Sequence, residues 1–110
     1  MSLISKLFGG FSTRGKAMAM YKRGMQRAGE RNLDGAISDY SEVVDMKGAP
    51  EDVVAMALLN RALAYSRAHD DDKAGEDLDR VIAMPGATKQ ILDAAHEKLH
   101  RMKRRVARPS

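Results

Sequence analysis

The fold is decided by the stretch LLNRALAY at residues 58–65, which continues through Ala74 to Met84. It predicts two short helices joined by the polar turn His69–Lys73, with small residues where the two helices approach each other. A shift of 38 residues aligns residues 17–46 with residues 55–84, and nine of these thirty positions are identical. The identical pairs are Ala17/Ala55, Met18/Met56, Ala19/Ala57, Arg23/Arg61, Asp34/Asp72, Ala36/Ala74, Asp39/Asp77, Val43/Val81 and Met46/Met84. Internal similarity at this period is typical of stacked helix-turn-helix units.

The composition predicts one domain with a modest core, since the chain has 110 residues. Five aromatic residues, no tryptophan and eight methionines indicate a core that is aliphatic, alanine-lined and methionine-filled. The absence of cysteine excludes a disulfide framework, a thiolate metal site and a thiol nucleophile. No apolar run reaches the roughly 18 residues that span a bilayer, and no signal-peptide pattern is present. We therefore expect a cytoplasmic protein.

The net charge of +4 is unevenly distributed along the chain. Residues 1–32 hold seven Lys/Arg and one acid, residues 33–100 hold seven and fourteen, and residues 101–110 hold five and none. The acidic middle and the basic ends bear on what the two ends bind rather than on how the chain folds. The basic C-terminal end has no aromatic side chain for base stacking, so a solvated tail is the favoured interpretation. The alternative is a salt-dependent contact with the phosphates of RNA, DNA or anionic lipid.

The N-terminal segment predicts an amphipathic element that needs a surface. Leu3, Ile4, Leu7, Phe8 and Phe11 would share one face of a helix, which Gly9-Gly10 would end. Such a short helix is unstable alone in water. Docking on its own domain or on a sister chain is the favoured interpretation. Peripheral membrane attachment, helped by Lys6, Arg14 and Lys16, and a disordered start are the alternatives.

Five helices are expected: four over about residues 15–29, 33–46, 50–68 and 88–105, and one between the last two that starts at Asp70 or Asp71 and ends before Pro85. The stop signals are Lys47–Pro50 and Pro85-Gly86, and the predicted caps are Asp70 or Asp71 and Thr88. Three apolar stripes face the predicted core: Ala36, Ile37, Tyr40, Val43 and Val44; Ala74, Leu78, Val81 and Ile82; and Ile91, Leu92, Ala95, Leu99 and Met102. The expected organisation is an N-terminal segment (1–14), a helical domain (15–105) and a disordered basic tail (106–110).

These spacings resemble the tetratricopeptide repeat, a 34-residue helix-turn-helix with the pattern Trp-x2-Leu-Gly-x2-Tyr…Ala-x3-Phe…Pro. The residues at the pattern positions are Met20, Arg23, Gly24, Arg27, Ala36 and Tyr40 in the first unit and Leu58, Arg61, Ala62, Tyr65, Ala74, Leu78 and Pro85 in the second. The departures are Arg23 and Arg61 for leucine, Arg27 for tyrosine, and an extra turn in the third expected helix. The resemblance implies an all-α, short right-handed solenoid with repeats at about 17–46 and 55–84 and a capping helix at 88–105. Gly24, Ala36, Ala62 and Ala74 are expected to provide close helix packing.

Members of this family are mostly protein-binding adaptors, and the first helix of each hairpin lines their peptide groove. The resemblance therefore implies a groove of Met18, Tyr21, Lys22, Met25, Met56, Leu59, Asn60, Leu63 and Arg67, with Gln90, Asp93 and Glu97 added by the last helix. A Met- and Leu-rich groove suits an apolar or amphipathic segment. The alternative is that these residues are simply buried against the N-terminal segment or a sister chain.

Some family members clamp acidic C-terminal tails with lysine, arginine and asparagine side chains. The corresponding positions here are Tyr21, Met25, Asn60, Gln90 and Ala94, so only the middle asparagine is kept. The resemblance does not extend to a carboxylate clamp.

Two patterns suggest metals and are rejected. His96-Glu97-Lys98-Leu99-His100 fits the H-E-x-x-H zinc-protease motif, but no His, Asp, Glu or Cys follows as a third ligand, and the following residues are basic. Asp70–Asp72 lacks the spaced oxygen ligands of a calcium loop and is better explained as a helix start. We therefore expect no metal, no cofactor and no enzyme activity.

The sequence thus predicts a small non-enzymatic protein-interaction module whose partner is a protein or peptide. The alternatives are a self-assembling homo-oligomeric scaffold that docks through residues 2–11 and an adaptor recruited to a membrane by the same segment.

Overall fold

The computed structural model describes residues 12–107, and the predictions about residues 1–11 and 108–110 lie outside this range. Within it the chain forms five helices and no strand: α2 (Thr13–Gly29), α3 (Leu33–Asp45), α4 (Glu51–Arg67), α5 (Asp71–Ile82) and α6 (Lys89–Ala107). The prediction of an all-α chain is confirmed. The long helices α2, α4 and α6 alternate with the shorter α3 and α5.

The helix ends differ from the predicted ones by a few residues, for local reasons. α2 begins at Thr13, inside the segment assigned to residues 1–14, because the Ser12 side chain caps it by accepting from the Gly15 N–H at 3.0 Å. α6 continues to Ala107, two residues into the predicted tail. Thr88 accepts from the Ile91 N–H at 3.3 Å, which places the predicted cap directly before α6.

The two turns inside the helix pairs have matching geometry. Arg31 and His69, which are 38 residues apart, both adopt φ +63°. The next residues, Asn32 and Asp70, cap α3 and α5 by accepting from the backbone N–H three residues ahead. Each of these turns therefore closes one helix and opens the next within three residues.

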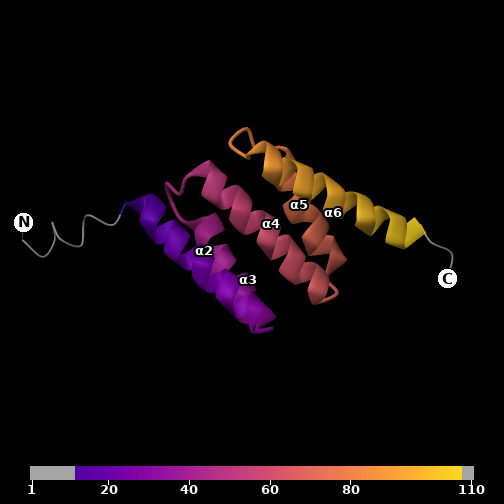
Figure 1. Cartoon of the computed structure of the whole chain (residues 1–110), viewed down its shortest axis with the longest axis horizontal. Coiled ribbons are helices and arrows are strands. Elements are labelled where there is room, and N and C mark those ends of the chain that lie inside the picture. The colour runs from indigo at the N-terminus through magenta and orange to yellow at the C-terminus, as the bar shows by residue number, and fades with distance from the viewer. Residues whose placement is uncertain (1–11, 108–110) are drawn as a thin grey trace, which may run out of the picture.

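The helices pack in order along the array. Figure 1 shows α2, α4 and α6 side by side, with α3 and α5 behind them. Each helix contacts its neighbour in the chain, and α4 also contacts α2 and α6. The helices α2, α4 and α6 therefore share one surface, and α4 lies at its centre.

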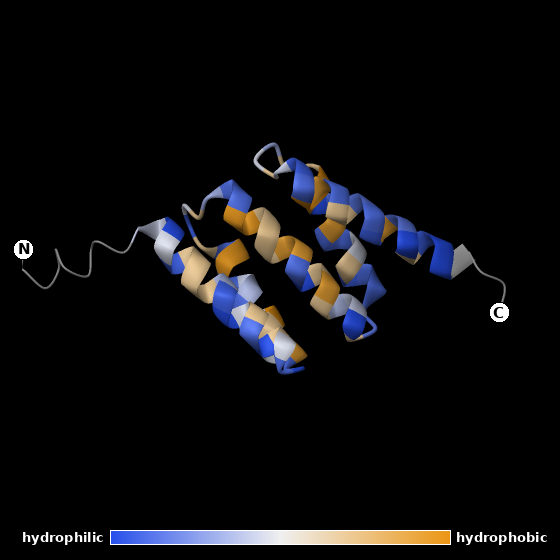
Figure 2. Cartoon of the chain, in the orientation of Figure 1, coloured by the Kyte–Doolittle hydropathy of each residue, from blue (hydrophilic) through white to orange (hydrophobic). Residues whose placement is uncertain are grey.

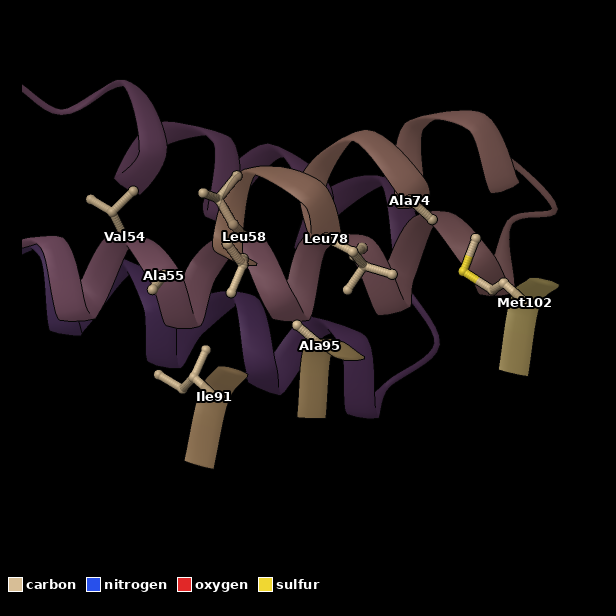
Figure 3. Packing of buried hydrophobic residues seen from close by; sticks show 10 residues of the cluster. Val54, Ala55, Leu58, Ala74, Leu78, Ile91, Ala95 and Met102 are labelled. Atoms are coloured by element: carbon tan, nitrogen blue, oxygen red, sulfur yellow. The ribbon is translucent and has the colours of Figure 1, made fainter. Parts of the chain in front are cut away.

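The core consists of two clusters that meet at α4. One cluster joins α2, α3 and the start of α4 through Ala17, Tyr21, Ala36, Tyr40, Val43, Val53 and Ala57. The other joins α4, α5 and α6, and Figure 3 shows Leu58 and Leu78 at its centre with Ile91, Ala95 and Met102 facing them from α6. α4 contributes to both clusters. It also carries more buried residues than α2, α3 or α5.

Small residues occupy the closest helix contacts. Gly24 of α2 lies against the Tyr40 ring of α3, and a Cβ at position 24 would stand 2.6 Å from a ring carbon. Ala36, Ala62 and Ala74 are fully buried. In the second helix pair, Ala62 replaces Gly24 and Leu78 replaces Tyr40, and both belong to one cluster. The leucine side chain is smaller than the tyrosine ring, which leaves room for the methyl group of Ala62.

The polarity of the helices follows their place in the array. Hydrophobic colours dominate the central helix α4 in Figure 2, whereas α6 at the end is mostly hydrophilic. α6 buries Ile91, Ala95 and Met102 and exposes most of its charged residues. Across residues 12–107 we find no helix with the length and apolar character needed to cross a membrane.

Candidate functional site

A groove opens on the surface shared by α2, α4 and α6. It has a volume of about 380 Å³ and is lined by Tyr21, Asp52, Met56, Leu59, Asn60, Thr88, Gln90, Ile91 and Ala94. We call this set the central groove. Its walls are mainly apolar, because α4 contributes Met56 and Leu59 and α6 contributes Ile91 and Ala94. An apolar concave surface between helices is a common form of binding site.

A polar pair lies within these apolar walls. The Asn60 Nδ2 donates to the Tyr21 hydroxyl at 3.0 Å and to the Met56 carbonyl at 2.9 Å. Burial raises the pKa of Tyr21 above its ordinary value, and the hydrogen bond from Asn60 partly opposes this shift. Tyr21 therefore keeps its proton at neutral pH.

This pair has unused hydrogen-bonding capacity. Asn60 engages only its amide nitrogen among the hydrogen bonds of the described residues, so its oxygen Oδ1 stays available as an acceptor. The Tyr21 hydroxyl accepts from Asn60 and retains its own proton for donation. The pair thus offers one donor and one acceptor, the two kinds of group that a peptide C=O and N–H can bond.

The structure distributes the nine predicted groove residues over several places. Tyr21, Met56, Leu59 and Asn60 line the central groove. Met18 packs against the first core cluster, Leu63 is half-buried, and Lys22 and Met25 are exposed, Met25 with 47% of its surface. Arg67 lines a different hollow of about 560 Å³ together with Ala28, Gly29, Arg31 and Leu33.

The last helix reaches the central groove with a different set of residues from the predicted one. Gln90 lines it, whereas Asp93 and Glu97 do not. Asp52, Thr88 and Ile91 were not predicted as lining residues. Thr88 was predicted only as the cap of the last helix, and nothing in the sequence placed Asp52 or Ile91 on this surface.

The lining also defines the charge of the central groove. The lining includes Tyr21, Asn60, Gln90 and Ala94, four of the five residues that the sequence analysis compared with a carboxylate clamp, and it contains neither lysine nor arginine. Its one charged residue is Asp52, whose carboxylate accepts two hydrogen bonds from Arg14 at 2.9 and 3.0 Å. The lining of the central groove is therefore mainly apolar and contains no cationic side chain.

Two ion pairs that each contain a buried aspartate were missed from the sequence. In the first helix pair, Arg23 donates to both carboxylate oxygens of Asp39, and Arg27 adds a longer bond of 3.3 Å. In the second pair, Arg61 donates to both oxygens of Asp77 at 2.8 Å and to Ser41 of α3 at 3.0 Å. These hydrogen bonds raise the pKa of Arg23 and of Arg61.

The two arginines of these ion pairs are residues at which the sequence differs from the tetratricopeptide pattern. Arg23 and Arg61 stand where that pattern has leucine, and each lies 16 residues before its aspartate. The signal was present, because both arginines and both aspartates are among the nine positions identical at the 38-residue offset. The pairs join the two helices within each helix pair and take no part in lining the central groove.

The two metal-like patterns lie on exposed surfaces. His96 and His100 are exposed on α6, and Glu97 binds Arg101. Asp70 caps α5, and Asp71 accepts from Arg105. Among the side chains that the structure describes, no group of three or more His, Cys, Asp or Glu residues is arranged to hold a metal ion.

Comparisons with protein-family models, with curated proteins and with solved structures found no match for this chain.

Proposed function

We propose that this chain is a small, non-enzymatic adaptor similar to tetratricopeptide proteins that binds an apolar or amphipathic peptide segment in the central groove. The observation that carries the proposal is the groove itself. Residues from the first helix of each helix pair and from α6 converge on one apolar surface of about 380 Å³. The 38-residue internal similarity and the alternation of long and short helices support the comparison with that family.

The groove chemistry suggests how a peptide would bind. Met56 and Leu59 provide adaptable apolar contacts, because thioether side chains repack at low cost. The Asn60–Tyr21 pair would bond one backbone amide of the ligand and so fix its position. Specificity would come from the spacing of the apolar residues in the ligand rather than from its charge.

The test uses peptides selected from a random display library against the full chain. Methyl-labelled methionine reports where a selected peptide binds, because Met56 lies in the central groove whereas Met20 and Met46 line a separate hollow. We expect spaced apolar residues in the selected peptides and a shift of the Met56 methyl signal.

A matched pair of variants sharpens this test. Ala94→Arg places a charged side chain in the central groove and should weaken peptide binding at least about tenfold, because the guanidinium would occupy the apolar site. Ala83→Arg makes the same change at an exposed position outside the groove and should leave binding unchanged. Peptides that leave the Met56 signal unmoved, or that bind Ala94→Arg as tightly as the parent, would overturn the proposal.

A further inference from the structure

A second apolar hollow lies on the outer side of the α2–α3 pair. It has a volume of about 470 Å³ and is lined by Lys16, Ala19, Met20, Arg23 and Met46. We call this set the outer hollow. It shares no lining residue with the central groove. Its floor is apolar, with two methionines, and its rim carries two cations.

The corresponding surface of the second helix pair is covered by a helix. The residues 38 positions later are Val54, Ala57, Leu58, Arg61 and Met84, and the first three are buried. α3 lies over this surface, because Arg61 donates to Ser41 of α3 and Val44 of α3 packs against the same cluster. Figure 3 shows Val54 and Leu58 within this cluster.

The outer hollow has no such cover among the described helices. α2 contacts α3 and α4, and no described helix lies over α2 as α3 lies over α4. Ala19 is exposed, whereas its counterpart Ala57 is fully buried. The Arg23 side chain is 49% exposed, and that of Arg61 only 15%. The first helix pair thus lacks the neighbouring helix that the second one has.

We propose that residues 2–8 of the same chain form a short helix that covers the outer hollow as α3 covers α4. The position of the chain supports this occupant. The hollow begins at Lys16, one helical turn after the start of α2 at Thr13. Residues 9–12 would connect the two helices, a length comparable with the five residues 46–50 that connect α3 to α4.

The dimensions and the polarity also agree. The lining on α2 runs from Lys16 to Arg23, and these seven steps span about 10 Å, about the length of a helix over residues 2–8. In such a helix Leu3, Ile4, Leu7 and Phe8 share one face. Lys6 falls on the opposite face and would point away from the cationic rim.

The covalent connection favours this segment over a second copy. A short tether gives the segment an effective concentration on the order of millimolar at the hollow. The same helix on another molecule would have to pay the full cost of association. The segment also gains stability on docking, because a helix of this length does not form alone in water.

The test uses Phe8→Trp in the full chain, which has no other tryptophan. We expect a blue-shifted emission that does not change with protein concentration. Ala19→Arg should shift the emission to the red, because the arginine blocks the outer hollow from an exposed position that the described fold tolerates. Met25→Arg, at another exposed position of α2 outside the hollow, should leave the emission blue-shifted.

Circular dichroism confirms that each variant stays folded. Red emission in Phe8→Trp itself would overturn the proposal. Loss of the blue shift in Ala94→Arg rather than in Ala19→Arg would place the segment in the central groove. A blue shift that grows with concentration, together with a dimer mass by light scattering, would assign the hollow to a second copy. A blue shift that requires anionic vesicles would assign the segment to a membrane, and each of these results also overturns the proposal. None of these readouts depends on peptide binding in the central groove.

Discussion

The helix pairs α2–α3 and α4–α5 share their internal contacts and differ in their surroundings. Both contain an arginine bound to an aspartate 16 residues later, and both turn through a residue at φ +63°. The second pair lies between α3 and α6, whereas the first has a described neighbour on only one side. Contacts inside a pair therefore follow from its own residues, and the burial of those contacts follows from the neighbouring helices.

The largest expected difference concerns the two ion pairs. Arg61→Ala leaves Asp77 buried without its two hydrogen bonds, which should lower the free energy of unfolding by about 3–5 kcal/mol. Arg23→Ala should cost less, because Arg27 still donates to Asp39. Urea denaturation of the two variants measures the difference. Equal losses would show that the hydrogen bond from Arg27 does not compensate for the loss of Arg23.

A double variant separates charge burial from packing. Arg61→Met combined with Asp77→Leu removes both charges and should recover much of the loss seen in Arg61→Ala, since no unpaired buried charge remains. If the double variant is as unstable as Arg61→Ala, the loss comes from removing the ion pair between α4 and α5. It does not then come from leaving the Asp77 charge buried and unpaired.

The next difference concerns alkaline pH, because Tyr40 of the first pair corresponds to Leu78 of the second. Burial raises the pKa of Tyr40 from its ordinary value of 10.0 to about 12. The unfolded chain releases this proton at lower pH than the folded chain, so stability present below pH 10 is lost as the pH rises through 12. The loss approaches about 1.4 kcal/mol per pH unit in this window, or roughly 2–3 kcal/mol in total.

Tyr40→Phe is the control for this prediction. Its stability relative to the parent should improve steadily between pH 10 and 12 and stay constant below pH 9, in urea denaturation at each pH. A difference that does not change across that window would show that Tyr40 ionises as easily in the folded chain as in the unfolded one.

A smaller difference concerns how each pair fills the contact between its helices. Gly24→Ala should cost about 1–3 kcal/mol, because the new Cβ meets the Tyr40 ring at 2.6 Å. Gly24→Ala with Tyr40→Leu recreates the Ala62–Leu78 combination of the second pair and should relieve this clash. A double-mutant cycle by urea denaturation measures the coupling. Additive effects would mean that the two positions do not constrain each other.

The helices could be predicted well from the sequence, and the sites only in part. Pro50, Gly48 and Asp70 are local stop and start signals, so helix positions were recoverable to within a few residues. The Arg–Asp pairs were visible as identities but not as contacts, because a separation of 16 residues acquires meaning only after the helices pair. The central groove depends on how three helices converge, so Tyr21 and Asn60 could be placed on a common surface by resemblance, whereas the rim residue Asp52 could not.

The smallest expected effect concerns a difference that the packing leaves unexplained. Gly75 lies in the middle of α5, where the first pair has Ile37, and a Cβ at position 75 would meet nothing within 4 Å. Gly75→Ala should therefore raise the free energy of unfolding by about 0.5–1 kcal/mol, since glycine loses more backbone entropy on folding. Thermal denaturation should show this as an increase in Tm of roughly 2–8 °C.

Gly48→Ala is the opposite control, because Gly48 has φ +79° and an alanine there would be strained. A lower Tm in Gly48→Ala and a higher Tm in Gly75→Ala would show that the fold requires glycine at position 48 and not at position 75. An unchanged or lower Tm in Gly75→Ala would contradict the prediction. The folded chain would then require glycine at position 75 for a reason that its internal contacts do not show. The two helix pairs would differ in this requirement as well as in their neighbouring helices.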